Sequence, residues 1–133
     1  MKKQKGFIFS SAFILAMVLL MFVSNNIFPK SYYDNGVTDQ QYISITDKTI
    51  EAQKFRELYE KNPNFSVDTD RDGALAVDYR MDTENPEKYL RLRIFIDPAT
   101  NKPAGKFIDC YPKMIYSGIL QYIEKNSCLE QKD

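Results

Sequence analysis

The sequence predicts an α+β domain that follows an N-terminal transmembrane helix. Three observations support this: a long uncharged stretch near the N-terminus, alternating apolar residues at 75–81 and 90–96, and helix-like apolar spacing on either side of them. We expect the transmembrane helix, then a helix, a four-stranded antiparallel meander and a C-terminal helix, with the helices packed on one face of the sheet. A chain of 133 residues suits one such domain.

The predicted parts are a cytoplasmic N-terminus at 1–6, a transmembrane signal anchor at 7–28, a linker at 29–45 and an extracytoplasmic domain at 46–133. The anchor has 22 residues, and as a helix it is about 33 Å long, enough to cross a hydrocarbon core of about 30 Å. Three lysines precede it within five residues, which favours a cytoplasmic N-terminus in a single-pass cell-membrane protein. The alternatives are a cleaved signal peptide, for which no small-residue cleavage site follows, and a buried soluble helix.

The residues Lys5-Gly6-Phe7 before an apolar helix also resemble the processing site of type IV prepilins, which is cut after glycine. Ser11 stands where bacterial major pilins carry a glutamate, five residues into the mature chain. The second interpretation is therefore a pilin-like structural subunit processed after Gly6. A mature chain that starts at position 7 would support this interpretation, and an intact N-terminus would contradict it.

The charge balance narrows the function classes. The chain has 18 Lys+Arg, 18 Asp+Glu and no His, which excludes Ser-His-Asp triads, Cys-His dyads and His-ligated zinc. Without the three N-terminal lysines, 15 basic and 18 acidic residues remain, a charge of about −3 that does not favour nucleic-acid binding. We expect a non-catalytic domain without a cofactor, whose partners are the membrane and an unidentified protein or peptide.

Within the domain, Thr46 or Asp47 is expected to cap a helix that ends at 62–64. Its apolar stripe comprises Ala52, Phe55, Leu58 and Tyr59. Strand patterns follow at 65–67, 74–81, 89–96 and 105–110. A last helix is expected to begin at Pro112 and end near Asn126, with a stripe formed by Ile115, Ile119, Tyr122 and Ile123.

The two cysteines, Cys110 and Cys128, are expected to form a disulfide because the domain lies outside the membrane. A loop of this size would add roughly 3 kcal/mol on the chain-entropy model. A helix running the whole way from residue 112 to 125 would hold the two cysteines too far apart, so the bond requires a shorter helix that returns along the last strand. The alternative is two unpaired, half-buried thiols.

The run Asp68-Thr69-Asp70-Arg71-Asp72-Gly73 resembles the start of a calcium loop, with carboxylates at positions 1, 3 and 5. Asp68, Asp70 and Asp72 are therefore candidate ligands of a weak calcium site. The twelfth position is Tyr79 instead of the glutamate that the loop requires, and the flanks do not read as two helices. The alternative is a polar hairpin tip, in which Asp and Gly serve the turn.

The third strand offers a candidate binding face, because Tyr89, Arg91, Arg93 and Phe95 occupy alternate positions. These side chains would share one side of the sheet and present arginines between aromatic rings. A sheet face of this composition suits a peptide or another ligand. The opposite interpretation is a solvated surface whose arginines are interleaved with Asp and Glu.

About 60 residues, from 50 to 110, resemble a PepSY-type module of a helix followed by a three- or four-stranded sheet. The matching segments are IEAQKFRELYEKNPNF, FSVD with GALAVDYR, and RLRIFIDPATNKPAGKF. In the last segment Asn101 replaces the typical glycine of the turn, and asparagine tolerates a left-handed backbone. The resemblance implies a secreted or membrane-anchored protein with an inhibitory, regulatory or binding role, often towards peptidases, and it supplies no catalytic residues.

Overall fold

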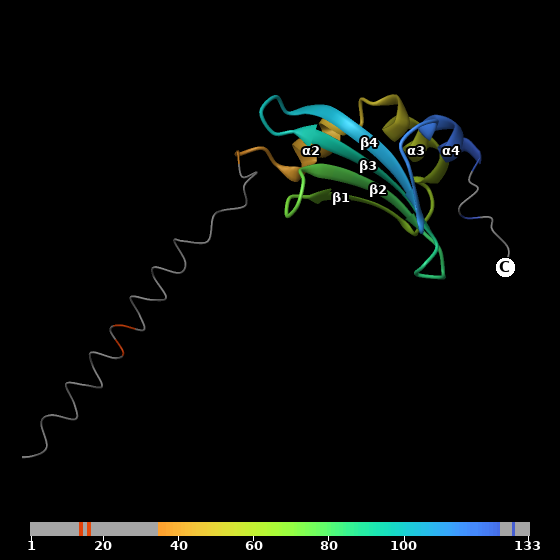
Figure 1. Ribbon diagram of the computed structural model, residues 1–133, viewed down its shortest axis with the longest axis horizontal. Helices are drawn as coiled ribbons and strands as arrows, with labels where there is room; N and C mark the ends of the chain where they lie inside the picture. Colours follow the sequence, from red (N-terminus) through yellow and green to blue (C-terminus); the bar gives the residue numbers. More distant parts are fainter. Residues whose placement is uncertain (1–13, 15, 17–34, 126–128, 130–133) are drawn as a thin grey trace, which may run out of the picture. The chain divides into compact units, whose positions relative to one another are not determined.

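Five strands form one antiparallel sheet in which every strand lies beside its neighbours in sequence, in the order β1-β2-β3-β4-β5 (Figure 1). The computed structural model describes residues 35–125 together with Ile14, Ala16 and Leu129. The sheet belongs to the second of two units of the chain, Tyr33–Asp133. The strands are β1 (Phe65–Asp70), β2 (Ala76–Asp82), β3 (Tyr89–Asp97), β4 (Lys102–Cys110) and β5 (Lys113–Ile115).

The predicted meander is confirmed, but it has five strands in place of four. The sequence predicts that 113–115 belong to the C-terminal helix, but they form β5, which pairs with the end of β4. Helix α4 (Ile119–Lys125) begins only after Gly118, whose positive φ of 66° separates it from β5. Ile115 and Ile119 have the four-residue spacing of a helix, yet Ile115 lies on a strand and Ile119 on a helix, and both pack on the core. The spacing alone could not distinguish one long helix from a strand followed by a short helix.

The predicted first helix of the domain corresponds to α3 (Ile50–Tyr59), and a further helix that the sequence did not predict, α2 (Asp39–Thr46), precedes it. Thr49 caps α3, because its side chain accepts a hydrogen bond from the amide of Ala52, so the expected cap at 46 or 47 is wrong. All of helix α2 except its last residue, Thr46, lies in the predicted linker at 29–45, so this part of the linker prediction is wrong. The helix begins with a capping box between Thr38 and Gln41.

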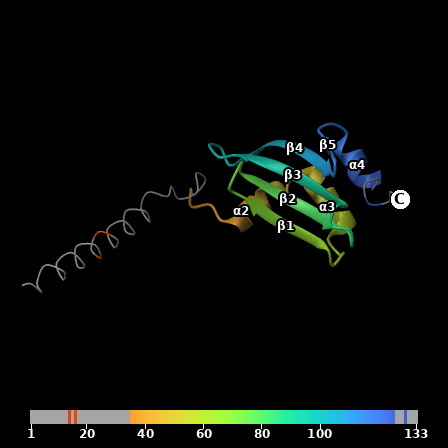
Figure 2. The same cartoon turned by 60° about the horizontal axis from the view of Figure 1, so that its bottom comes forward.

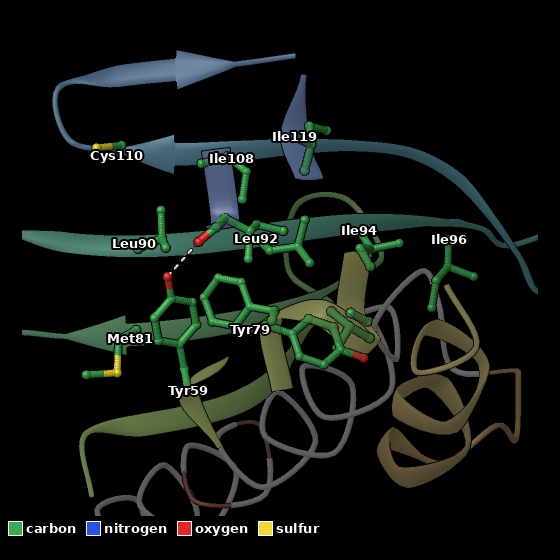
Figure 3. Close-up of a cluster of buried hydrophobic side chains, with 14 of the residues drawn as sticks. Tyr59, Tyr79, Met81, Leu90, Leu92, Ile94, Ile96, Ile108, Cys110 and Ile119 are labelled. Carbon is green, nitrogen blue, oxygen red and sulfur yellow. Dashed lines mark hydrogen bonds between the residues drawn. The ribbon is translucent and has the colours of Figure 1, made fainter. Parts of the chain in front are cut away.

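All three described helices cover the same face of the sheet, as predicted (Figures 1 and 2). Alternate strand residues point toward the helices and are buried, which confirms the period-two pattern in β2 and β3. Figure 3 shows this core, which includes Leu75, Val77, Tyr79, Met81, Leu90, Leu92, Ile94, Ile96 and Ile108. On α3 the stripe is narrower than predicted, because Leu58 is 44% exposed while Phe55 is fully buried.

Across the described residues, no helix has the length and apolar character needed to cross a membrane. The predicted transmembrane segment at 7–28 lies outside the described residues, apart from Ile14 and Ala16. The membrane anchor therefore stays a prediction.

A polar junction joins the two N-terminal helices to the sheet. The hydroxyl of Tyr79, fully buried on β2, lies 2.7 Å from Thr46 Oγ1 and donates to Asp47 Oδ1 at 2.7 Å. Asp47 also accepts from Arg56 Nε at 2.7 Å. Burial raises the pKa of Tyr79 far above its usual value, and the carboxylate of Asp47 adds to this rise. The short connection between α2 and α3 is thus fixed by a strand residue.

Replacing Tyr79 by Phe is expected to cost about 1–2 kcal/mol at pH 7, because Asp47 keeps Arg56 and loses only one donor. The raised pKa adds a pH dependence. The phenol ionises near pH 10 in the unfolded chain and higher in the fold, so its stabilisation is complete below about pH 10 and is lost as the pH rises further. Urea unfolding at pH 7 and pH 10.5 should show a smaller alkaline loss in Tyr79→Phe than in the wild type. Equal losses would contradict this.

Candidate functional site

The face of the sheet opposite the helices carries the predicted binding residues. Because their neighbours on β3 are buried against the helices, Tyr89, Arg91, Arg93 and Phe95 all project from this second face. No helix among the described residues covers it (Figure 2). We call it the open face, defined by these four residues and their neighbours on β2, β4 and β5.

The two arginines of the open face are held by aspartates. Arg93 Nε donates to Asp78 Oδ1 at 2.7 Å, and Arg93 Nη2 donates to Asp70 Oδ2 at 2.8 Å. Arg91 Nη2 donates to Asp109 Oδ2 at 2.6 Å, and its Nη1 lies 3.6 Å from Asp78 Oδ2. The hydrogen bond to Asp78 raises the pKa of Arg93 above its usual value. The arginines therefore do not act as free cations on this surface.

Asp109 anchors one end of this network. Only 4% of the residue is exposed, and it accepts hydrogen bonds from Arg91 and from the hydroxyl of Tyr89, the latter at 3.0 Å. Burial raises the pKa of Tyr89, and the hydrogen bond to Asp109 raises it further. The guanidinium of Arg80 lies 4.3 Å from the centre of the Tyr89 ring. Sequence reasoning selected Tyr89 and Arg91 but missed Asp109, although its position opposite Arg91 follows from the β3–β4 register.

An aromatic row crosses the same face beside the charged network. The ring centres of Phe95 and Phe107 are 5.8 Å apart, and those of Phe107 and Tyr116 are 5.6 Å apart. Tyr116 is 68% exposed and Met114 is 54% exposed, whereas Phe107 is buried. The open face thus combines neutralised charges with solvent-exposed apolar area, a composition typical of protein-binding surfaces.

The candidate calcium ligands lie at and beside the turn between β1 and β2. Asp70 Oδ1 accepts from the amide of Asp72, and Oδ2 accepts from Arg93. The Asp72 amide, and then the charge of Arg93, lower the pKa of Asp70. Within the described part of the chain, no group of three or more acidic or cysteine side chains is arranged to hold a metal ion. Calcium binding through Asp68, Asp70 and Asp72 stays a prediction.

Arg71, in the middle of that turn, has a structural role that the sequence did not reveal. Its Nη2 donates to the carbonyl of Val37 at 2.7 Å, and its Nε donates to Asp39 at 2.8 Å. Its guanidinium lies 5.2 Å from the centre of the Tyr42 ring. The β1–β2 turn therefore holds the segment through which the chain reaches α2.

The turn between β3 and β4 holds the same segment from the other side. Asn35 Nδ2 donates to Asn101 Oδ1 at 3.2 Å, and Tyr42 donates to Asn35 Oδ1 at 2.9 Å. Asn101 has a φ of 54°, the left-handed backbone that asparagine tolerates in place of glycine. We call this end of the sheet, with Arg71, Asn101 and Asn35, the tether end.

A pocket of about 240 Å³ lies at the opposite end of β4, which we call the distal end. It is lined by the β2–β3 loop, the β4–β5 turn and α4. Cys110 lines it and is buried, and no cysteine in the described residues is free. Cys128 lies outside the described residues, so its disulfide with Cys110 stays a prediction.

Comparisons with known proteins identified no relative of the chain. No family model matches it, and no curated protein or solved structure gives a significant match.

Proposed function

We propose that this chain is a single-pass membrane protein whose extracytoplasmic domain binds a protein or peptide partner on the open face, without catalysing a reaction. The observation that carries the proposal is that one sheet face has no helix over it within the described residues and combines fixed arginine–aspartate pairs with exposed Met114 and Tyr116. Exposed apolar side chains beside polar ones are the usual make-up of a protein interface. The resemblance to PepSY-type modules points to the same binding or regulatory class.

The attachment of the chain to the sheet supports this arrangement. The predicted anchor at 7–28 is separated from Asn35 by six residues, which span at most about 20 Å when extended. Asn35 is hydrogen-bonded to Asn101 at the tether end of the sheet. The predicted anchor is therefore connected to the domain through the tether end. The four residues of β3 that define the open face take no part in this hydrogen bond.

Site-specific photo-crosslinking in intact membranes tests the proposal. We expect benzoylphenylalanine in place of Met114 or Tyr116 to give a discrete adduct, because both side chains are exposed on the open face. The matched control places the same group at Glu57, whose side chain is 66% exposed on α3, away from the open face. Equal adducts from position 57, or none from positions 114 and 116, would refute binding at the open face.

A further inference from the structure

Strand β1 forms one margin of the sheet (Figure 2). Its pairing with β2 is regular over all six residues, from Phe65 opposite Met81 to Asp70 opposite Ala76. It contains no proline, no lysine and no bulge, the features by which edge strands usually resist the addition of another strand. Among the described residues, no strand pairs with the outer edge of β1.

The other margin of the sheet is better protected. Strand β5, which ends the sheet there, has three residues and pairs with only the last three residues of β4. The rest of β4 carries Lys102, Pro103 and Lys106, and its pairing with β3 is irregular between Phe95 and Ile96. Short strands, lysines, proline and bulges all disfavour strand addition. The outer edge of β1 is therefore the edge better suited to accept a further strand.

The hydrogen-bond pattern shows which main-chain groups of β1 face outward. Residues of an antiparallel strand bond alternately to one side and to the other. The amide of Asp82 donates to the carbonyl of Asn64 at 3.3 Å, so residues 64, 66, 68 and 70 bond to β2. Val67 and Thr69 therefore direct their N–H and C=O groups outward, and no described residue outside the strands bonds to them.

On the helix side of the sheet, the edge of β1 suits apolar and hydroxyl side chains. Phe65 and Val67 are half-buried against the core on this side. Thr69, opposite the buried Val77, also lies on this side, and its buried hydroxyl has no hydrogen-bond partner in the described part of the chain. Residues directly opposite each other on neighbouring strands share a face. A strand beside β1 would therefore place apolar residues next to Phe65 and Val67, and a hydroxyl next to Thr69.

On the side of the open face, the edge of β1 is acidic. Asp68 is exposed, and its carboxylate makes no ion pair or hydrogen bond with any described residue. Asp97 and Lys102 lie opposite each other and add no net charge. A second copy of β1 would bring its own aspartates to this side, whereas lysines or arginines are complementary to it. The other charged strand residues on this side are five aspartates and three arginines, all three arginines being paired: Asp68, Asp70, Asp78, Asp82, Asp109, Arg80, Arg91 and Arg93.

We propose that the outer edge of β1 accepts an extended basic peptide segment as an additional antiparallel strand. Its lysines or arginines face Asp68, and they alternate with apolar and hydroxyl residues on the helix side. Val67 and Thr69 each exchange main-chain hydrogen bonds with one residue of the segment. Met114 and Tyr116 lie at the other margin of the sheet, so this surface goes beyond the binding proposed above, and either proposal can fail without the other.

Amide hydrogen exchange tests the proposal, measured by NMR on the full chain in detergent micelles with the peptide Lys-Thr-Lys-Val-Lys-Val. At saturation, we expect exchange of the Val67 and Thr69 amides to slow by about tenfold or more, because strand addition gives them acceptors. The amides of Ser66 and Asp68 are the internal control, since they already bond to β2 and should change less. Lys-Lys-Lys-Val-Val-Thr, and the first peptide with glutamates in place of its lysines, should have no effect.

Two variants separate main-chain pairing from charge, with fluorescence anisotropy of the labelled peptide as the measurement. Val67→Pro removes an outward N–H and keeps the bonds to β2, so it should abolish binding while circular dichroism shows that the sheet is retained. Asp68→Lys should weaken binding of the basic peptide by roughly fivefold. Glu57→Lys, the same change in charge at an exposed position on α3, should change it by less than twofold.

The exchange measurement on the wild type decides the proposal even if Val67→Pro fails to fold. No slowing at Val67 and Thr69, equal slowing at all four amides, or equal binding of the basic and acidic peptides would overturn it. Protection of Val67 and Thr69 without peptide would also overturn it. Such protection would assign the edge to a second copy if it grows with protein concentration, and to another segment of the same chain if it does not.

Discussion

Replacing Phe55 by Ala is expected to lower the free energy of unfolding by about 3–5 kcal/mol, the largest effect of any single change we consider. Phe55 is fully buried at the centre of α3. Its ring centre lies 4.8 Å from that of Tyr59, 6.2 Å from Phe65 and 6.4 Å from Tyr79. Truncation removes all three aromatic contacts and leaves a cavity between the helix and the sheet. For a domain of about 100 residues, this loss is a large part of the total free energy of unfolding, which is usually about 5–15 kcal/mol.

The control for Phe55→Ala is Leu58→Ala on the same helix. The sequence placed both residues on one apolar stripe, but Leu58 is 44% exposed and its removal should cost well under 1 kcal/mol. Urea unfolding of the full chain in detergent micelles, followed by far-ultraviolet circular dichroism, measures both. Similar costs for the two variants would mean that α3 does not face the sheet as described.

The strands could be predicted because one face of the sheet is buried and the other is not. A period of two in β2 and β3 follows directly from that condition, and the same alternation placed Tyr89, Arg91, Arg93 and Phe95 on one face. The turn at Asn101 came from the resemblance to PepSY-type modules, and asparagine there adopts the left-handed backbone that it tolerates. The alternation of the strands depends on local sequence alone.

The features that escaped prediction depend on partners distant in sequence. The one large ring that helix α2 buries is that of Tyr42. The guanidinium of Arg71, 29 residues after Tyr42 in the chain, lies over this ring and helps to fix the helix. The three-residue strand β5 exists because β4 offers it an edge. The neutralisation of Arg91 and Arg93 likewise requires β2 and β4 to bring Asp78 and Asp109 beside them. Composition showed that acidic residues were available, but only the register shows which ones pair.

Asp78 is the residue on which the electrostatics of the open face depend most. Its side chain is 15% exposed and it faces both Arg91 and Arg93, which are 20% and 19% exposed. We expect Asp78→Ala to lower the free energy of unfolding by about 2–4 kcal/mol, because two half-buried guanidinium groups lose a shared counter-ion. Arg93 keeps Asp70 and Arg91 keeps Asp109, which prevents a larger loss.

Asp82 provides the matched control for Asp78, since it lies on the same strand and face and also accepts a 2.7 Å hydrogen bond from an arginine, Arg80. That pair is more exposed, at 42% for Asp82 and 36% for Arg80, so Asp82→Ala should cost no more than about 1 kcal/mol. Urea unfolding in low salt and in 1 M salt distinguishes the two, because screening should weaken only the exposed pair. If Asp78→Ala cost no more than Asp82→Ala, the arginines of β3 would not be fixed by β2. A partner would then meet mobile cations on the open face instead of fixed arginine–aspartate pairs.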